Sequence, residues 1–169
     1  PGEMVHGDTK RLPPITSLPI RKRIREVLYI AIDDATRYLV ADILPDKTMW
    51  SSSIFFEITL LRMPCKIDCH YSDNGGEYRG NKDHAFTALC ARNGIMQRFT
   101  KPHHPWTNGK AERVIRTILS EWFRKNTFTS YEERKKSLYA FVDFYNHKRT
   151  HMGLNGLTPV QKLTSLLEY

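Results

Sequence analysis

Five short segments along the chain carry the apolar or alternating patterns of β-strands. The second and third flank the turn residues "DATR", so together they predict a β-hairpin. The fourth, "CKIDCHYS", has cysteine, isoleucine and tyrosine at every other position, which predicts a strand buried on one face. The five predicted strands cover residues 3–8, 26–34, 38–44, 65–72 and 95–100.

Helical periodicity occupies most of the remaining chain. One predicted amphipathic helix begins at a capping Asp46 or Thr48 and stops before Pro64. The apolar residues expected on its buried face are Ile54, Ile58 and Leu61. Further helices are predicted at 84–94, 109–122 and 130–145, with a short one in "GLTPVQKL".

The order of these elements predicts the fold class. Three strands come first, and later strands alternate with helices, which is typical of an α/β domain with a mixed five-stranded sheet flanked by helices. We expect one domain over residues 1–169, with a basic, proline-rich loop at about 10–25 and a C-terminal tail at about 148–169.

The composition of the chain indicates which class of partner it binds. The chain has 26 Lys and Arg against 18 Asp and Glu, a net charge of +8, which favours a polyanion such as nucleic acid. The longest apolar run, "VLYIAI", is far shorter than the ~20 residues of a membrane span, so no membrane partner is expected. The three cysteines lack paired metal-ligand spacing, and neither a disulfide framework nor a structural zinc site is expected. No secretory leader precedes the opening at Pro1, and we expect a piece of a longer protein.

Three carboxylates occupy comparable places, each at the start or end of a predicted element. Asp8 closes the first strand, Asp73 follows the fourth, and Glu112 opens the long helix. Oxygen ligands from three separate segments suit a hard divalent cation such as Mg²⁺ or Mn²⁺. The residue types alone leave other roles open, because Asp at a strand end also forms turns and Glu112 is spaced to pair with Arg116.

The segments around these acids resemble a known family. "HGD", "YSDNGGEY" and "PHHPWTNGKAER" are similar to the three signature segments of the DDE recombinases, which are insertion-sequence transposases and retroviral integrases. The 39 residues from Asp73 to Glu112 are close to the family's spacing. "IDDATRYLVADIL" and "YNHKRTHMGLNGLTPVQKL" extend the resemblance over nearly the whole chain. It implies a ribonuclease H-like fold.

The resemblance also implies a role for each acid. Asp8 would bridge two Mg²⁺ or Mn²⁺ ions, and Asp73 and Glu112 would each complete the coordination of one ion. Asp33 or Asp34 is an alternative first ligand, but both belong to a recurring family segment whose acids are expected to serve the hairpin turn.

DNA is the partner that the resemblance implies, both as element end and as target. The expected chemistry is strand cleavage followed by strand transfer from the freed 3′-OH. The expected DNA contacts are Lys110, Arg113, Arg116 and His104. The roles of His103 and Trp106, on the loop before the helix, stay open between DNA contact and loop packing. Asn146, Arg149 and His151 are expected to fix the C-terminal turn.

The same resemblance sets expectations for assembly and location. We expect a homodimer or higher assembly without a small-molecule cofactor. The bacterial branch of the family implies a cytoplasmic protein that associates with the nucleoid when active. Three other functions remain open: a ribonuclease H-like nuclease, a metal-free DNA-binding or assembly module, and a protein-binding domain without salt-dependent affinity for DNA.

Overall fold

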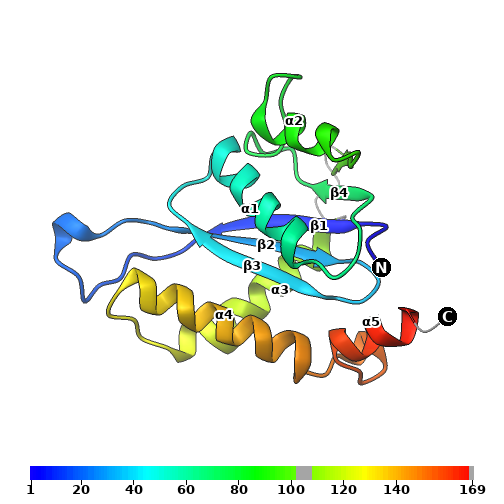
Figure 1. Ribbon diagram of the computed structural model, residues 1–169. Helices are drawn as coiled ribbons and strands as arrows, with labels where there is room; N and C mark the ends of the chain where they lie inside the picture. The colour runs from blue at the N-terminus through cyan, green and yellow to red at the C-terminus, as the bar shows by residue number, and fades with distance from the viewer. Residues whose placement is uncertain (102–107, 168–169) are drawn as a thin grey trace.

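A five-stranded sheet forms the centre of the computed structural model, which describes residues 1–101 and 108–167 (Figure 1). The strands lie in the order β3-β2-β1-β4-β5. The pairs β1–β2 and β2–β3 are antiparallel, whereas β1–β4 and β4–β5 are parallel. The mixed five-stranded sheet predicted from the sequence is therefore confirmed. The strands are β1 (Val5–Arg11), β2 (Val27–Asp33), β3 (Leu39–Leu44), β4 (Cys69–Ser72) and β5 (Met96–Phe99).

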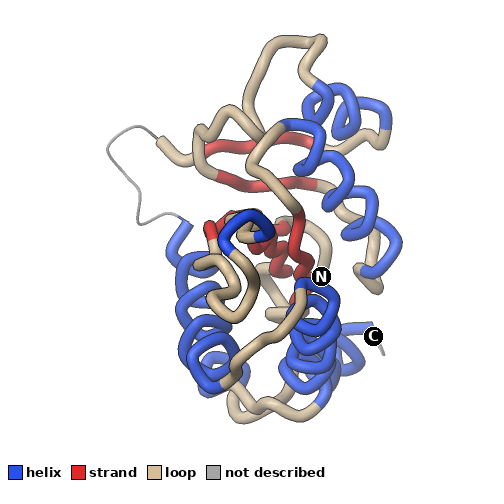
Figure 2. The backbone as a smooth tube through the Cα atoms, turned by 90° about the vertical axis from the view of Figure 1, so that its left-hand side faces the viewer, coloured by secondary structure: helices blue, strands red, loops and turns tan. Residues whose placement is uncertain are grey.

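Helices cover both faces of this sheet (Figures 1 and 2). The long helices are α1 (Met49–Arg62), α2 (Ala85–Arg92), α3 (Gly109–Thr117), α4 (Tyr131–His147) and α5 (Pro159–Leu167). The short turns are η1 (Ile20–Lys22), η3 (Ile118–Trp122, one π-helical turn), η4 (Phe123–Lys125) and η5 (Met152–Leu154). None of the helices in the described residues is long and apolar enough to cross a membrane.

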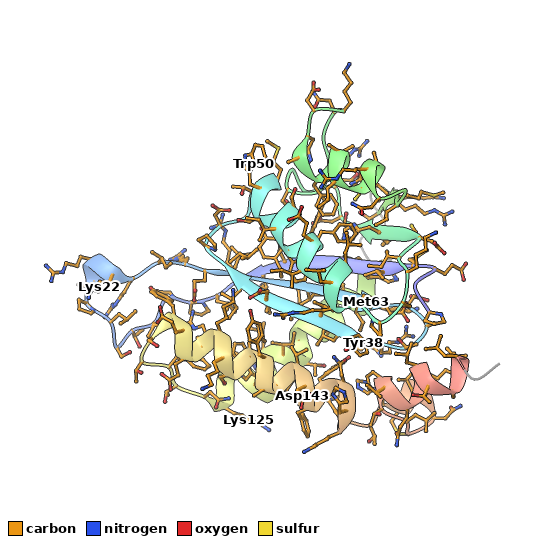
Figure 3. All side chains as sticks on the ribbon, in the orientation of Figure 1. Lys22, Tyr38, Trp50, Met63, Lys125 and Asp143 are labelled. Atoms are coloured by element: carbon orange, nitrogen blue, oxygen red, sulfur yellow. The ribbon has the colours of Figure 1, made fainter. Side chains whose placement is uncertain are left out.

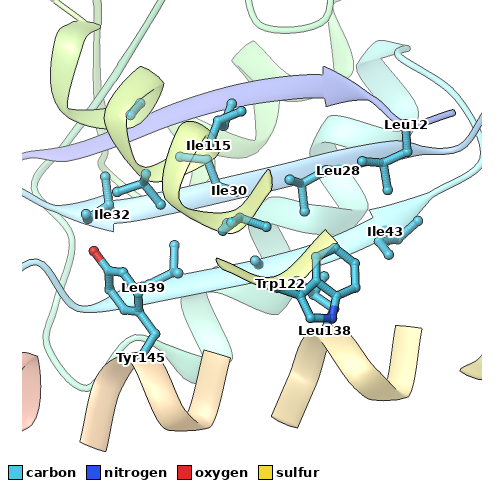
Figure 4. Packing of buried hydrophobic residues seen from close by; sticks show 14 of the residues in the cluster. Leu12, Leu28, Ile30, Ile32, Leu39, Ile43, Ile115, Trp122, Leu138 and Tyr145 are labelled. Atoms are coloured by element: carbon cyan, nitrogen blue, oxygen red, sulfur yellow. The ribbon is translucent and has the colours of Figure 1, made fainter. Parts of the chain in front are cut away.

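Successive residues of β2 point to opposite faces of the sheet and enter different cores. Leu28 and Ile30 pack with α3 and α4 (Figure 4), whereas Val27 and Tyr29 pack with α1 and α2. Because both faces of β2 are buried, its sequence "VLYIAID" is apolar almost throughout rather than alternating.

The turn between β2 and β3 is fixed by one aspartate. Asp33 Oδ2 accepts hydrogen bonds from the backbone N–H of Thr36 at 2.8 Å and from its hydroxyl at 2.6 Å. Asp33 Oδ1 accepts a third from the N–H of Gly2 at 2.7 Å. These three donors engage the carboxylate in the turn, the role expected for it from the sequence.

Helix α1 begins at the capping Thr48 but buries a different face from the one predicted. Phe55 and Phe56 pack inward, whereas Ile54 and Leu61 are 51% and 86% exposed. Ile58 is partly buried against the core, but the prediction was wrong for Ile54 and Leu61 because apolar residues occur on two sides of this helix. Ile54, Ile58 and Leu61 have the helical spacing, but Phe55 and Phe56 fill the space above the sheet.

Strand β1 is longer than its sequence pattern indicated. It was predicted to end at Asp8, yet its pairing with β2 continues to Arg11, opposite Val27. Asp8 is therefore an interior residue of a strand. Residues 12–26 leave the sheet beyond this point and project away from it (Figure 1). We call residues 12–26 the basic arm.

Candidate active site

The pairing of β1 with β4 places Asp8 beside Asp73. The two strands are parallel, with Val5 opposite His70 and His6 opposite Tyr71. Two further steps in the same register set Asp8 next to Asp73, which directly follows β4. Neighbouring strands lie about 4.8 Å apart, so these two acids occupy adjacent positions.

Asp8 faces the side of the sheet that α3 covers. Its partner across the β1–β2 pair is Ile30, which belongs to the core under α3 and α4. Directly paired residues of antiparallel strands point to the same face. Glu112 lies in the first turn of α3 and is exposed. The first strand and the long helix therefore bring their acids to one side of the sheet.

A buried asparagine fastens the start of α3 to β1. Asn108, the N-cap residue of α3, donates from Nδ2 to the backbone carbonyl of Gly7 at 3.2 Å. Its Oδ1 lies 3.3 Å from Nδ1 of His6. Both contacts are within two residues of Asp8, so Asn108 fixes where the first turn of α3, with Glu112, meets the strand. The sequence did not predict these contacts of Asn108.

Asp34 ties the hairpin turn to the same place. His6 Nε2 lies 2.8 Å from Asp34 Oδ1, and the ammonium of Lys110 forms an ion pair with the same carboxylate. Burial alone would raise the pKa of Asp34, but the hydrogen bonds from Lys110 and His6 outweigh it and lower the pKa below its ordinary value. Asp34 therefore links the β2–β3 hairpin to α3.

Glycine is required directly before Asp8. A Cβ atom at Gly7 would lie 2.4 Å from Nε2 of His70, whose buried ring packs over the strand. A side chain at this position would displace His70 or bend β1 away from β4. The "HGD" sequence thus reflects close packing beneath the site.

The charges of Asp73 and Glu112 act on Asp8. The pKa of Asp8 is raised from 3.8 to about 6, chiefly because burial disfavours its charged form, and the charges of Asp73 and Glu112 also raise it. The N–H of Thr9, 2.7 Å from Asp8 Oδ1, and the ammonium of Lys47 lower it. Residues 8, 73 and 112 therefore share one electrostatic environment.

Glu77 is a fourth acid at this site, and the sequence analysis missed it. Its buried carboxylate forms an ion pair with Lys47 at 2.9 Å and accepts a hydrogen bond from the hydroxyl of Thr9 at 3.3 Å. A Cβ atom at Gly75 would meet Glu77 Oε2 at 2.4 Å and Asp73 Oδ1 at 2.9 Å. The missing side chain at Gly75 therefore leaves room for both carboxylates.

The chemistry of these donors fits a divalent cation, although the side chains are not arranged around one. Among residues 1–101 and 108–167, no three His, Cys, Asp or Glu side chains form a group able to hold a metal ion. Asp8 and Asp73 instead accept hydrogen bonds from nearby backbone N–H groups. The charges of Asp73 and Glu112 disfavour the ionised form of Asp8, and a bound cation would offset that repulsion.

A basic cleft lies next to Glu112. It has a volume of about 710 Å³ and is lined by α3, by Arg37 and by residues 149–153. Arg113 and Arg116 line it, and neither forms an ion pair with a residue of the described ranges. Lys110 also lines the cleft, but its ammonium is paired with Asp34. His104, with His103 and Trp106, lies outside the described residues.

The polar residues of the C-terminal segment hold neighbouring elements together. The side chain of Asn146 donates to the backbone carbonyl of Leu39 at 2.8 Å and accepts from its N–H at 2.9 Å. Arg149 makes a two-bond ion pair with Glu121, at 2.7 and 2.6 Å. Half-buried His151 packs its ring on Tyr145. These contacts agree with the structural role expected for residues 146, 149 and 151.

Replacing Asn108 with alanine is expected to lower the free energy of unfolding by about 1–2 kcal/mol, because the Gly7 carbonyl would be left buried without a donor. Urea unfolding monitored by circular dichroism measures this change. Asn93→Ala, an exposed amide at the end of α2, is the control and is expected to change stability by less than about 0.5 kcal/mol. Equal effects of the two substitutions would contradict the anchoring role.

Known proteins share parts of this sequence. Residues 93–159 match the sequence model of the integrase core domain family. The putative transposase InsK for insertion sequence element IS150 of Escherichia coli K12 is 28% identical over 91 residues, 54% of this chain and 31% of that protein. An uncharacterized transposase-like protein of Haemophilus influenzae is 26% identical over 97 residues, 57% of this chain and 44% of that protein. The chain spans less than half the length of these relatives.

Solved structures share the fold. The catalytic core domain of BIV integrase has a TM-score of 0.71 at 19% identity and covers 99% of this chain and 98% of its own. A chain of the simian T-cell lymphotropic virus intasome, in complex with PP2A regulatory subunit B56 gamma, has a TM-score of 0.73 at 18% identity, over 89% of this chain and 50% of its own. The fold is the ribonuclease H-like fold of integrase catalytic cores.

The family match over residues 93–159, the transposase relatives and this fold make the chain similar to the core domains of transposases and integrases. Proteins of this type bind DNA and use divalent metal ions.

Proposed function

We propose that this chain is the catalytic core of a DNA transposase, with Asp8, Asp73 and Glu112 as its catalytic and metal-holding acids. The observation that carries the proposal is the raised pKa of Asp8, to which Asp73 and Glu112 both contribute. Acids from two other segments of the chain thus act on the charge of Asp8, which lies in the central strand of the sheet. An aspartate that only formed a turn, or a glutamate that was only a surface charge of a helix, would not need to lie near other acids.

In the proposed reaction, the oxygen of a water molecule attacks phosphorus at the element end, and the bond from phosphorus to the 3′ oxygen breaks. The freed 3′-OH then attacks a phosphodiester of target DNA, forms a new ester bond and displaces a 3′ oxygen of the target. Each step exchanges one phosphate ester bond and needs no covalent protein intermediate.

Asp8, Asp73 and Glu112 are the residues that would hold Mg²⁺ or Mn²⁺ ions, because the charges of Asp73 and Glu112 both act on Asp8. Such ions, when bound, stabilise the attacking and leaving oxygens of an in-line displacement at phosphorus. Asn108 and the Asp34–Lys110 ion pair hold the start of α3 against β1. The ion pair of Glu77 with Lys47 supports the segment that follows β4.

The basic cleft beside Glu112 is the proposed place for the DNA backbone. Arg113 and Arg116 present guanidinium groups there without a carboxylate partner in the described residues, and guanidinium binds phosphate oxygens in a two-bond geometry. Lys110 would reach phosphate only by leaving Asp34. His104 is proposed as a further contact to the DNA end.

Strand cleavage and joining on a short duplex test this proposal. With Mn²⁺, the wild-type chain is expected to nick a duplex carrying the element end and to join its 3′ end to a second duplex. Glu112→Gln and an EDTA control are expected to do neither. Glu112 is exposed, so its substitution leaves the fold intact, as circular dichroism checks.

The other outcomes separate the rival functions. Activity of Glu112→Gln equal to that of the wild type would contradict the catalytic assignment. DNA binding without any cleavage would favour a non-catalytic assembly module, and cleavage of RNA in a hybrid without strand transfer would favour a nuclease.

Assembly and location are also part of the proposal. The intasome neighbour supports a dimer or higher assembly on DNA, which analytical ultracentrifugation with and without duplex measures. The relatives from Escherichia coli and Haemophilus influenzae support a bacterial cytoplasmic protein that meets DNA at the nucleoid.

A further inference from the structure

The basic arm, together with the end of β1 that leads into it, is rich in positive charge and poor in negative charge. The stretch from residue 10 to residue 25 contains six Lys or Arg and no Asp or Glu, in a chain whose net charge is +8. All six side chains are exposed, and none forms an ion pair with a residue of the described ranges. They are Lys10, Arg11, Arg21, Lys22, Arg23 and Arg25. Figure 3 shows Lys22 at the far end of the arm, well away from the rest of the molecule.

The arm is held in a defined position. At its base, Leu12 and Ile15 are buried in the core under α3 and α4. Farther out, the hydroxyl of Tyr131 at the start of α4 accepts a hydrogen bond from the N–H of Ile24 at 2.7 Å and donates to the carbonyl of Lys22 at 2.8 Å. The cations of the arm are thus presented at a fixed place.

One arm cation is used internally and the others are free to bind. The guanidinium of Arg23 donates to the carbonyls of Leu18 at 2.8 Å and Thr16 at 2.5 Å, which closes the end of the arm. Arg21, Lys22 and Arg25 make no side-chain hydrogen bond in the described structure. These three are the cations that the arm offers to a partner.

A regularly charged polyanion is the partner that such an arm fits. Fixed, unpaired cations repel one another, and a DNA duplex offers one phosphate charge for every ~1.7 Å along its axis. The arm continues β1 away from Asp8, and Arg11 lies three residues beyond Asp8, about 10 Å at 3.3 Å per residue. The N–H of Leu12 donates to the carbonyl of Glu26 at 2.8 Å, so the arm returns to this place and Arg25 lies at its base. A duplex with its cleaved bond at Asp8 would therefore meet the base of the arm within about one helical turn, ~34 Å.

We propose that the basic arm is a second DNA contact, which binds phosphates of the duplex next to the cleaved bond through charge and without reading base sequence. This inference rests on the proposed function for the identity of the polyanion. It assigns Arg21, Lys22 and Arg25 to backbone binding and leaves catalysis to the acids on β1, β4 and α3.

The test compares two triple variants of the full chain that change net charge equally. The arm variant is Arg21→Gln, Lys22→Gln, Arg25→Gln, and the matched control is Lys82→Gln, Lys136→Gln, Lys148→Gln. All six positions are exposed, so both proteins should fold, which circular dichroism checks. Affinity is measured in EDTA by fluorescence anisotropy, on a 40-base-pair and a 10-base-pair duplex over a range of salt concentrations.

The arm variant is expected to bind the long duplex about tenfold or more weakly than the wild type. The slope of log affinity against log salt should fall by about 2–3, because each lost phosphate contact removes about 0.9 from the slope. The control should keep the wild-type slope on the long duplex. On the short duplex, which offers far fewer phosphates beyond the site, the difference between the arm variant and the control should be smaller.

Equal slopes for the arm variant and the control on the long duplex would overturn the inference. The exposed Ile20 and Ile24 would then indicate a protein-binding arm. Failure of the proposed function is seen separately, in the cleavage assay. If the wild type fails to cleave DNA but the arm variant still binds DNA more weakly, the arm contact is supported. Only the catalytic assignment is then removed.

Discussion

Asp8→Asn is expected to abolish strand cleavage and, at the same time, to stabilise the metal-free protein. Asparagine keeps the shape and the acceptor for the N–H of Thr9 but removes the charge that holds metal. We expect at least a thousandfold loss of Mn²⁺-dependent cleavage. We also expect a gain of about 2 kcal/mol in the free energy of unfolding at pH 8 in EDTA, because ionised Asp8 is buried beside Asp73 and Glu112.

The sign of the stability effect follows from the direction of the pKa shift. The pKa of Asp8 is about 6 in the folded protein, above its ordinary value of 3.8, so the folded state binds this proton more tightly than the unfolded chain. The resulting stabilisation is complete below pH ~4 and is lost as the pH rises through about 6. The wild type and Asp8→Asn should therefore be similar at pH 4 and differ at pH 8.

Thermal unfolding at the two pH values measures this difference, which corresponds to roughly 4–8 °C at pH 8 for a chain of this size. Asp68→Asn, which removes an exposed carboxylate, is the matched control and should have little effect at either pH. Added Mn²⁺ should stabilise the wild type but not Asp8→Asn. A variant less stable than the wild type at pH 8 would show that Asp8 is a structural acid.

Local rules of chain conformation predicted most of the fold. The apolar run of β2 and the turn residues after it gave the hairpin, since neighbouring strands and a tight turn depend on adjacent residues. Thr48 caps α1, and Ser130 caps α4 by accepting from the N–H of Glu133 at 3.1 Å. Each of these capping signals lies within four consecutive residues, so it can be recognised in the sequence without knowledge of the fold.

The site depends on contacts that no local pattern contains. Asn108 meets His6 across 102 positions, and Glu77 meets Thr9 across 68. The neighbouring placement of Asp8 and Asp73 follows from the pairing of β1 with β4, which are separated in sequence by the hairpin and α1. The family resemblance named Asp8, Asp73 and Glu112, but the supporting residues become visible only when the strands are placed side by side.

Arg134→Met is expected to destabilise the fold by about 3–5 kcal/mol at pH 8, a large part of the stability of a typical domain. The Arg134 side chain is 2% exposed, and its Nη1 lies 3.2 Å from Oε2 of Glu26, at the point where the basic arm joins β2. The guanidinium also lies over the rings of Phe123 and Phe128. Methionine fills similar volume but leaves the Glu26 carboxylate buried without a partner.

The double variant Glu26→Gln, Arg134→Met separates loss of the charge partner from loss of packing. Burial raises the pKa of Glu26 and Arg134 lowers it, so removing Arg134 should raise that pKa further. The cost of Arg134→Met should therefore diminish as the pH falls and Glu26 takes up a proton. Urea unfolding at pH 8 and pH 5 measures both effects, with exposed Lys136→Met on the same helix as the control. If the double variant is no more stable than Arg134→Met, the loss comes from packing against the two phenylalanines and the ion pair contributes little.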